Sequence, residues 1–230
     1  MARPTDRGLL FQPFRTRPTG RPGIDGVRPF SLVPEAKSLP PYRHAHRFMA
    51  SELKPLFNPE IVRQRLLAFT LPDSLEAARP RVRHWGDLIA SGKADAIKET
   101  ALLPEFLTDI FGQVLGYTGP AGSGDSYTLS RETHVEVDGQ FADAVLGRFT
   151  SAEKHFIVAV EGKGTRDPLD RPFSGRRMSA VDQAYRYAIN LPCDWILVTS
   201  MRETRLYHKG SDQKTCERFE TVALADDPVC

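Results

Sequence analysis

The fold is decided by two apolar runs and the helix that follows them. The first run is QFADAVLGRF (140–149), and the second is HFIVAVEGKG (155–164). The second run is apolar on both faces, which is typical of a central strand. A basic loop at 164–177 leads into VDQAYRY (181–187), which lies within a predicted helix at 178–190. Two paired strands, a loop and a helix are therefore the expected centre of the fold.

The segments on either side complete an α/β architecture. Helical periodicity and capping residues precede the two runs, and short apolar runs follow them. The expected elements are helices that start at 58, at 73 or 74 and at 95, strands at 127–137, 194–200 and 204–208, and one more strand or helix after 211. A strand–helix–strand unit requires a right-handed crossover between parallel strands. We therefore predict a mixed central β-sheet flanked by helices, with further helices on its N-terminal side.

Packing residues can be assigned in two of these helices. The helix at 95–114 is expected to bury a stripe that begins at Ile97, and Pro104 within it predicts a bend. The helix at 178–190 is expected to pack through a face that includes Tyr185 and Ile189.

Residues 1–48 differ from the rest of the chain. They hold eight of the 18 prolines, and nine Lys and Arg residues against three acidic ones. Such a segment buries too little apolar surface to offset its ordering entropy, so we expect disorder. Two interpretations stay open: a basic arm that binds DNA, or translation that starts at Met49. We assign 49–222 to one folded domain and 223–230 to a frayed tail.

Composition excludes several classes of protein. No run of about 18 apolar residues is present, as a transmembrane helix requires, and no secretory signal is recognisable. Three cysteines without metal-site spacing fit reduced thiols in a cytoplasmic protein. Residues 49–230 carry 22 basic and 26 acidic residues, a net charge of 22 − 26 = −4. If this part binds DNA, it does so through a local basic patch.

Three charged residues in the two apolar runs could form a metal site. Side chains alternate along a strand, so Glu161 and Lys163 point the same way, and antiparallel pairing brings Asp143 alongside them. Mg²⁺ prefers oxygen ligands, often one or two carboxylates with water and phosphate. Each residue alone would be read as a turn or a strand end in solvent. Together, at the end of a buried strand, they favour a metal site because unpaired buried charge is costly.

The loop and the following helix supply further candidates. The loop carries Arg166, Arg171, Arg176 and Arg177, and Arg is suited to phosphate contacts, although a solvated loop is an equal alternative. Gln183 and Tyr187 are four residues apart and share a helix face. The bland alternative for this pair is an ordinary helix surface.

Five blocks of the sequence resemble the PD-(D/E)XK nuclease superfamily, and more narrowly the N-terminal nuclease region of fused, type IIG restriction–modification enzymes. The blocks are KET…FLTDIFGQVLGY (98–117), FADAVLGRF (141–149), FIVAVEGKGTRDPLD (156–170), VDQAYRYA (181–188) and DWILVTSMRETRLY (194–207). The resemblance covers about residues 58–210. It implies a restriction-endonuclease-like core that hydrolyses phosphodiester bonds of duplex DNA with Mg²⁺, for which Mn²⁺ can substitute.

The resemblance also implies a role for each candidate residue. Asp143 and Glu161 would bind the metal, Lys163 would be the catalytic lysine, and Glu99 would be an additional acidic group. Gln183 and Tyr187 would form the Gln-x-x-x-Tyr helix motif, with Gln183 at the catalytic site and Tyr187 among the nucleic-acid contacts. One departure is that Ala142 precedes Asp143, where relatives often have proline.

A second departure concerns the domains that accompany such nucleases. Fused enzymes continue into methyltransferase and target-recognition domains, whose motifs are missing here, so we expect a separate nuclease subunit, a truncated product or an excised domain. A methyltransferase or specificity subunit is then an expected partner, as is a second copy, since one site cuts one strand. The alternatives are a catalytically silent subunit that binds DNA or a methyltransferase, and a nuclease of this fold that acts on RNA or in repair.

Overall fold

The computed structural model describes residues 53–70, 74–122, 124–134 and 141–226. The expectations for residues 1–48, for the strand end at 135–137 and for Cys230 lie outside these ranges. Cys193 and Cys216 are buried free thiols. Within the described ranges, no helix combines the length and apolar character needed to cross a membrane.

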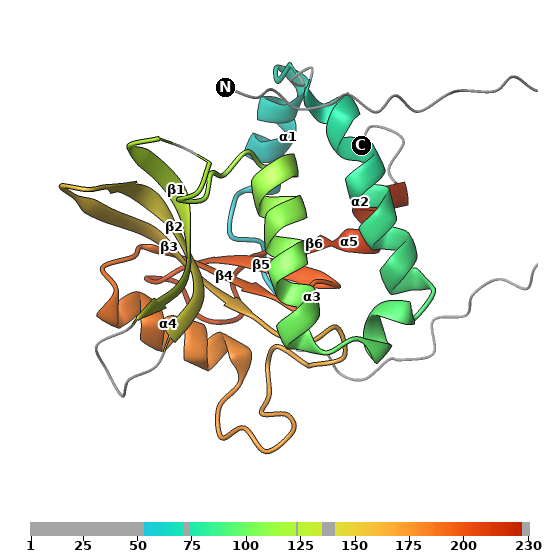
Figure 1. Ribbon diagram of the computed structural model, residues 1–230. Helices are drawn as coiled ribbons and strands as arrows, with labels where there is room; N and C mark the ends of the chain where they lie inside the picture. Colours follow the sequence, from blue (N-terminus) through green and yellow to red (C-terminus); the bar gives the residue numbers. More distant parts are fainter. Residues whose placement is uncertain (1–52, 71–73, 123, 135–140, 227–230) are drawn as a thin grey trace, which may run out of the picture. The chain divides into compact units, whose positions relative to one another are not determined.

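The centre of the fold is a six-stranded sheet in the order β1-β2-β3-β4-β5-β6 (Figure 1). The strands are β1 (Ser126–His134), β2 (Phe141–Thr150), β3 (Lys154–Gly162), β4 (Trp195–Thr199), β5 (Glu203–His208) and β6 (Glu217–Glu220). Only β3 and β4 pair in parallel, and the remaining neighbours are antiparallel. The helix α4 (Ala180–Asn190) connects the parallel pair. The predicted mixed α/β sheet with flanking helices is confirmed.

Helices cover both faces of this sheet. The N-terminal set is α1 (Pro59–Leu67), α2 (Ser74–Ala90), the 3₁₀ turn η1 (Lys93–Ala96), α3 (Glu99–Phe106) and the π-helix η2 (Leu107–Val114). The short helix α5 (Thr221–Asp226) follows β6 and packs on α2. Residues 223–226, which were expected to fray, therefore belong to a helix. Figure 1 shows α2, α3 and α5 together on one side of the sheet, with α4 on the other.

The single helix predicted at 95–114 is three elements. Ile97 is in extended conformation between η1 and α3, and the chain widens into the π-helix η2 three residues after Pro104. Proline has no amide hydrogen and its ring crowds the preceding turn, so the regular α-helical pattern is already weakened there. The Thr108 hydroxyl donates to the Pro104 carbonyl at 2.8 Å. A bend was expected, but not this change of helix type.

Two apolar layers hold the sheet between the helices. One lies under α4 and includes Val145, Ala159 and Ile196. The other lies under α2, α3 and η2 and includes Leu146 and Val160. The alternation of β2 and β3 residues between the layers is the two-residue period of a strand buried on both faces.

Two residues that were expected in the core are exposed. Ile189 is 74% exposed because the face of α4 that meets the sheet is taken by Tyr187 and Ala188. Ile97 is 42% exposed because it links two elements rather than lying on a helix. Both predictions of burial were wrong.

A glycine allows α3 to lie directly against the sheet. A Cβ atom at Gly162 would stand 2.4 Å from the Leu103 side chain. Gly162 is the last residue of β3, so this contact holds α3 beside the end of that strand. The first residue of α3, Glu99, is thereby brought close to Lys163 and Gly164.

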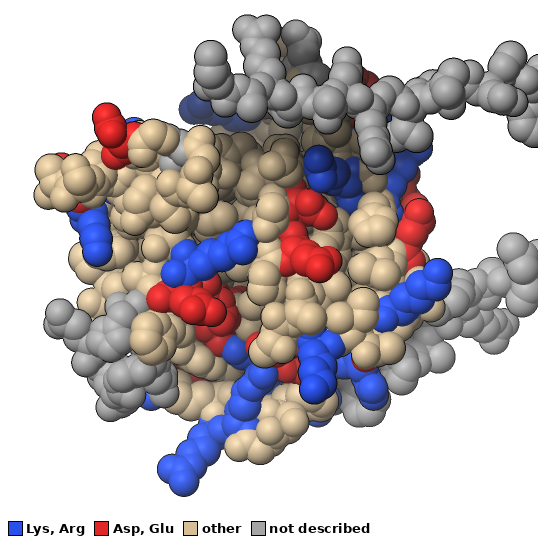
Figure 2. Space-filling view, in the orientation of Figure 1, with Lys and Arg blue, Asp and Glu red and all other residues tan. Residues whose placement is uncertain are grey.

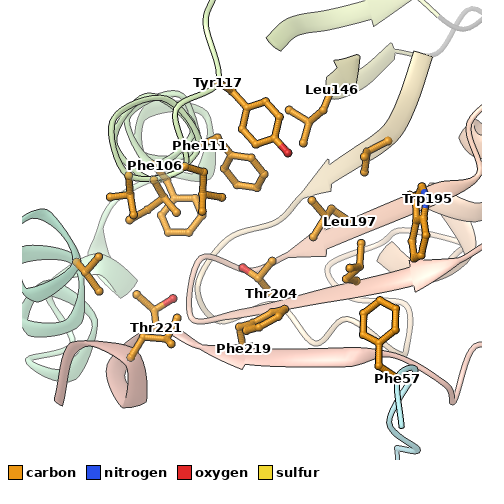
Figure 3. Close-up of a pocket in the computed structure, with 17 residues that line it drawn as sticks. Phe57, Phe106, Phe111, Tyr117, Leu146, Trp195, Leu197, Thr204, Phe219 and Thr221 are labelled. Atoms are coloured by element: carbon orange, nitrogen blue, oxygen red, sulfur yellow. The ribbon is translucent and has the colours of Figure 1, made fainter. Parts of the chain in front are cut away.

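The face of the sheet that α2, α3 and η2 cover also contains an apolar cavity of about 520 Å³ (Figure 3). Phe106 and Phe111 line it from the helices, and Trp195, Leu197 and Phe219 line it from the sheet. Because Leu197 lies in the layer under α2 and α3, this cavity is on the opposite face of the sheet from α4.

Candidate functional site

The predicted acidic pair forms where β2 and β3 run side by side. Ala144 pairs with Val160, so Asp143 lies next to the end of β3. The Gly162 amide donates to Asp143 Oδ2 at 2.7 Å. The Lys163 amide donates to the Thr199 carbonyl at 2.8 Å, which extends the pairing with β4 beyond the strand. Asp143, Glu161 and Lys163 are therefore brought together, as the alternation of the two runs predicted.

Burial makes the charged forms of these residues energetically costly. Glu161 is 1% exposed and Lys163 is 5% exposed, and the Lys163 ammonium donates to Glu161 Oε1. Burial, followed by the negative charge of Asp143, raises the pKa of Glu161 to about 8. Burial also raises the pKa of Asp143, against the stabilising hydrogen bond from Gly162. One ammonium group therefore leaves a buried and a half-buried carboxylate incompletely compensated.

The residues present fit a divalent metal ion. Glu161 Oε2 is buried and has no hydrogen-bond partner, and a buried unpaired oxygen beside a second carboxylate is an arrangement that a cation would relieve. Among the described residues, no three His, Cys, Asp or Glu side chains gather closely enough to form a metal site. Mg²⁺ commonly takes only one or two carboxylates and completes its shell with water and phosphate. Asp143 and Glu161 can supply that pair.

Glu99 reaches the site in a different way from the acidic pair. Its Oε2 atom accepts from the Gly164 amide at 2.9 Å and from Arg176 Nη2 at 3.0 Å. Its negative charge also contributes to the raised pKa of Asp143, after the larger effect of burial. Glu99 thus lies beside the candidate metal pair and fixes the backbone directly after Lys163.

The base of the loop after β3 is tied down by further ion pairs. Arg176 Nη1 donates to Asp167 at 2.7 Å, so this guanidinium is shared between Asp167 and Glu99. Asp95 accepts from the Thr165 hydroxyl at 2.6 Å and from Arg202 at 3.1 Å. The first of these bonds is the main reason that the pKa of Asp95 is lowered. The loop that carries the basic residues is therefore anchored to η1 through Asp95 and to α3 through Glu99.

The four loop arginines do not share one environment. Arg166, Arg171 and Arg177 are exposed, whereas Arg176 is engaged by two carboxylates. Figure 2 shows basic side chains extending from the lower part of the face, where this loop lies, with acidic side chains next to them near the centre. Of the three exposed arginines, Arg166 lines a polar groove together with Glu99.

The helix pair Gln183 and Tyr187 lies inward. Tyr187 is 2% exposed, and Gln183 Nε2 donates to its hydroxyl at 2.5 Å. Burial raises the pKa of Tyr187 to about 12, with smaller contributions from Glu161 and Asp143, so the ring lies near the acidic pair. Direct contact of Tyr187 with nucleic acid, as predicted, is not compatible with this burial. The physical reason is that this face of α4 packs into the core under the sheet.

Sequence reasoning missed the role of Arg205. Its side chain is 7% exposed and makes a two-armed contact with Asp170 at 2.5 and 3.0 Å, while its Nε donates to Glu203 at 2.5 Å. This guanidinium therefore ties the loop after β3 to β5. The residue lies in the block DWILVTSMRETRLY (194–207), but no local pattern indicated that its partner Asp170 lies 35 residues away.

Replacing Arg205 with alanine is expected to lower the free energy of unfolding by about 2 kcal/mol, because three charge-assisted hydrogen bonds at a buried guanidinium are lost. Arg218→Ala is the matched control, since its side chain is 49% exposed and also pairs with Glu203. Its expected cost is about 0.5 kcal/mol or less. Urea unfolding of both variants measures the difference, and equal losses would contradict a special role for Arg205.

No protein-family model matches the chain, and no curated protein and no solved structure matches it either.

Proposed function

We propose that the protein is a metal-dependent endonuclease of the PD-(D/E)XK type that hydrolyses phosphodiester bonds of DNA. The observation that carries the proposal is the pair of half-buried Asp143 and buried Glu161, with one Glu161 oxygen lacking a partner, next to the Lys163 ammonium. A cluster of two carboxylates and one ammonium, of which Glu161 and Lys163 are buried, is expensive for a purely structural role. Perturbed carboxylates of this kind concentrate at functional sites.

Asp143 and Glu161 would hold the metal in this proposal. A bound Mg²⁺ ion, or Mn²⁺ in its place, would supply a water of lowered pKa and offset negative charge at the phosphorus. The Lys163 ammonium would stabilise the oxygens that gain negative charge during hydrolysis, through its positive charge and its hydrogen bonds. Its position is set by the backbone bonds of Lys163 to Thr199 and of Gly164 to Glu99.

The surrounding residues would bind and align the DNA. Arg166, Arg171 and Arg177 are exposed and suited to contacts with backbone phosphates. Arg176 has a positioning role, because it joins Glu99 to Asp167 and so holds the loop against α3. Gln183 orients the buried Tyr187 hydroxyl beside the acidic pair.

A role in restriction follows from the quoted sequence resemblance and belongs to the same proposal. It includes a separate methyltransferase or specificity subunit as partner, and pairing of two copies for a cut in both strands. The competing proposal is a catalytically silent subunit of the same fold that binds DNA or the methyltransferase.

Nicking of supercoiled plasmid by the full chain tests the proposal. We expect open-circular DNA in the presence of Mg²⁺ or Mn²⁺, none in EDTA, and loss of nicking in Asp143→Asn. Wild-type protein that leaves the plasmid intact, alone and with the methyltransferase added, and that binds no Mn²⁺ in calorimetry would support the silent subunit instead.

A further inference from the structure

A polar groove of about 370 Å³ is lined by Gly164, the residue that follows Lys163 in the chain. Glu99 lines the groove as well, and it accepts a hydrogen bond from the Gly164 amide. Thr165, Asp167 and Arg176 continue the lining along the base of the loop. This volume is of the size of one nucleotide rather than of a duplex.

Two apolar side chains from different elements line this otherwise polar groove. Ile97, between η1 and α3, is 42% exposed, and Phe173, on the loop after β3, is 40% exposed. Neither contributes to the apolar layers that hold the sheet. A flat aromatic ring and a branched aliphatic side chain in one groove are suited to a flat apolar ring between them.

The backbone presents Phe173 in a defined way. Ser174 and Gly175 both have positive φ, at 53° and 80°, and the Arg176 amide donates to the Phe173 carbonyl at 3.2 Å. This is a tight turn with its two central residues in the left-handed region. Because Arg176 is held by Glu99 and Asp167, the turn that carries Phe173 is fixed to the candidate active site.

The polar groups of the groove favour amino groups over phosphate. Asp95, Glu99 and Asp167 place three carboxylates in the lining, against the two guanidinium groups of Arg166 and Arg176. Asp95 and Asp167 are held by Thr165 and Arg176, and each carboxylate has acceptor capacity beyond those bonds. Carboxylates accept from the exocyclic amines of bases. A phosphate in the groove would instead meet excess negative charge.

We propose that this groove binds one unstacked nucleobase of the nucleic-acid substrate, next to the phosphate that is cut. The base lies between Ile97 and Phe173, its amino edge faces Asp95 and Asp167, and Arg166 contacts the adjoining phosphate. The inference rests on the proposed nuclease function for the identity of the substrate. It adds that DNA with an unpaired or flipped base is preferred over a perfect duplex, since a stacked base cannot enter the groove.

Binding of the full chain to two fluorescein-labelled 20-base-pair duplexes tests this preference. The duplexes are identical except for one unpaired central adenine in the second, and anisotropy is measured in EDTA so that no cleavage occurs. We expect the wild-type protein to bind the bulged duplex about 10-fold more tightly, within the range that base–aromatic stacking supports. Equal affinities, or no binding of the bulged duplex, would overturn the proposal.

Variants of Phe173 show whether the groove causes the preference. Phe173→Ala is expected to bring the affinity ratio of the two duplexes close to one, while Phe173→Trp retains it because an aromatic face remains. Phe219→Ala is the control: Phe219 is 44% exposed but lines the apolar cavity, which shares no lining residue with the groove. A preference that survives in Phe173→Ala, or that is lost equally in Phe219→Ala, would contradict the assignment.

The same preparations separate this inference from the proposed function. Plasmid nicking by the wild type, without a preference for the bulged duplex, would leave the nuclease in place and remove the base-binding groove. A Phe173-dependent preference without any nicking would retain the groove and count against the nuclease.

Discussion

Replacing Lys163 with alanine is expected to lower the rate of metal-dependent DNA nicking by about 100- to 1000-fold, the usual effect of removing one group that stabilises developing charge. Lys163 is 5% exposed and its ammonium donates to Glu161. The loss is expected in kcat rather than in KM, because the ammonium interacts most strongly with the charge that forms during hydrolysis.

Two controls make this result specific. Lys209→Ala removes an exposed lysine that pairs with Asp194 at 2.7 Å, and it is expected to leave nicking unchanged. Lys163→Arg is expected to remain impaired, because a planar guanidinium cannot occupy a buried site shaped for an ammonium. Nicking by Lys163→Ala at more than a tenth of the wild-type rate, with normal thermal unfolding, would show that Lys163 is not catalytic.

The acidic site could be predicted because short-range rules decide it. Side-chain alternation placed Glu161 and Lys163 on one face, and the short connection between the two apolar runs required antiparallel pairing. Together these rules bring Asp143 alongside, and the register of Ala144 with Val160 confirms it. The mixed sheet followed equally from a helix between two buried strands.

The remaining features depend on contacts that no local pattern contains. Arg176 was expected to contact phosphate, but its partners Glu99 and Asp167 hold it, and Glu99 is 77 residues away. Helical periodicity alone could not show that Ile97 would lie between two elements and face a groove. Tyr187 could be placed on a helix, but which face of α4 meets the sheet depends on the whole packing.

The free energy of unfolding of the metal-free protein is expected to depend on pH. Burial and Asp143 raise the pKa of Glu161 from 4.5 to about 8, so the folded protein retains a proton that the unfolded chain has already released. Stability therefore falls as the pH rises from about 4.5 to about 8, by at most about 1.4 kcal/mol per pH unit for one proton. The raised pKa of Asp143 acts in the same direction, and the two carboxyls titrate as a pair.

Glu161→Gln should remove most of this dependence, because a neutral amide of the same shape carries no charge into the buried site. The free energy of unfolding is measured with urea in EDTA. Between pH 5.5 and pH 8.5, the value for the variant should rise relative to that of the wild type by more than about 1 kcal/mol. Glu153→Gln, at an exposed position between β2 and β3, is the control, and its effect should be equal at both pH values. If the free energies of unfolding of the wild type and of Glu161→Gln changed equally with pH, the pair would not hold a proton.

Added Mg²⁺ should stabilise the wild type at pH 8.5 but not the variant, since a cation bound at Asp143 and Glu161 replaces the proton that the pair otherwise retains.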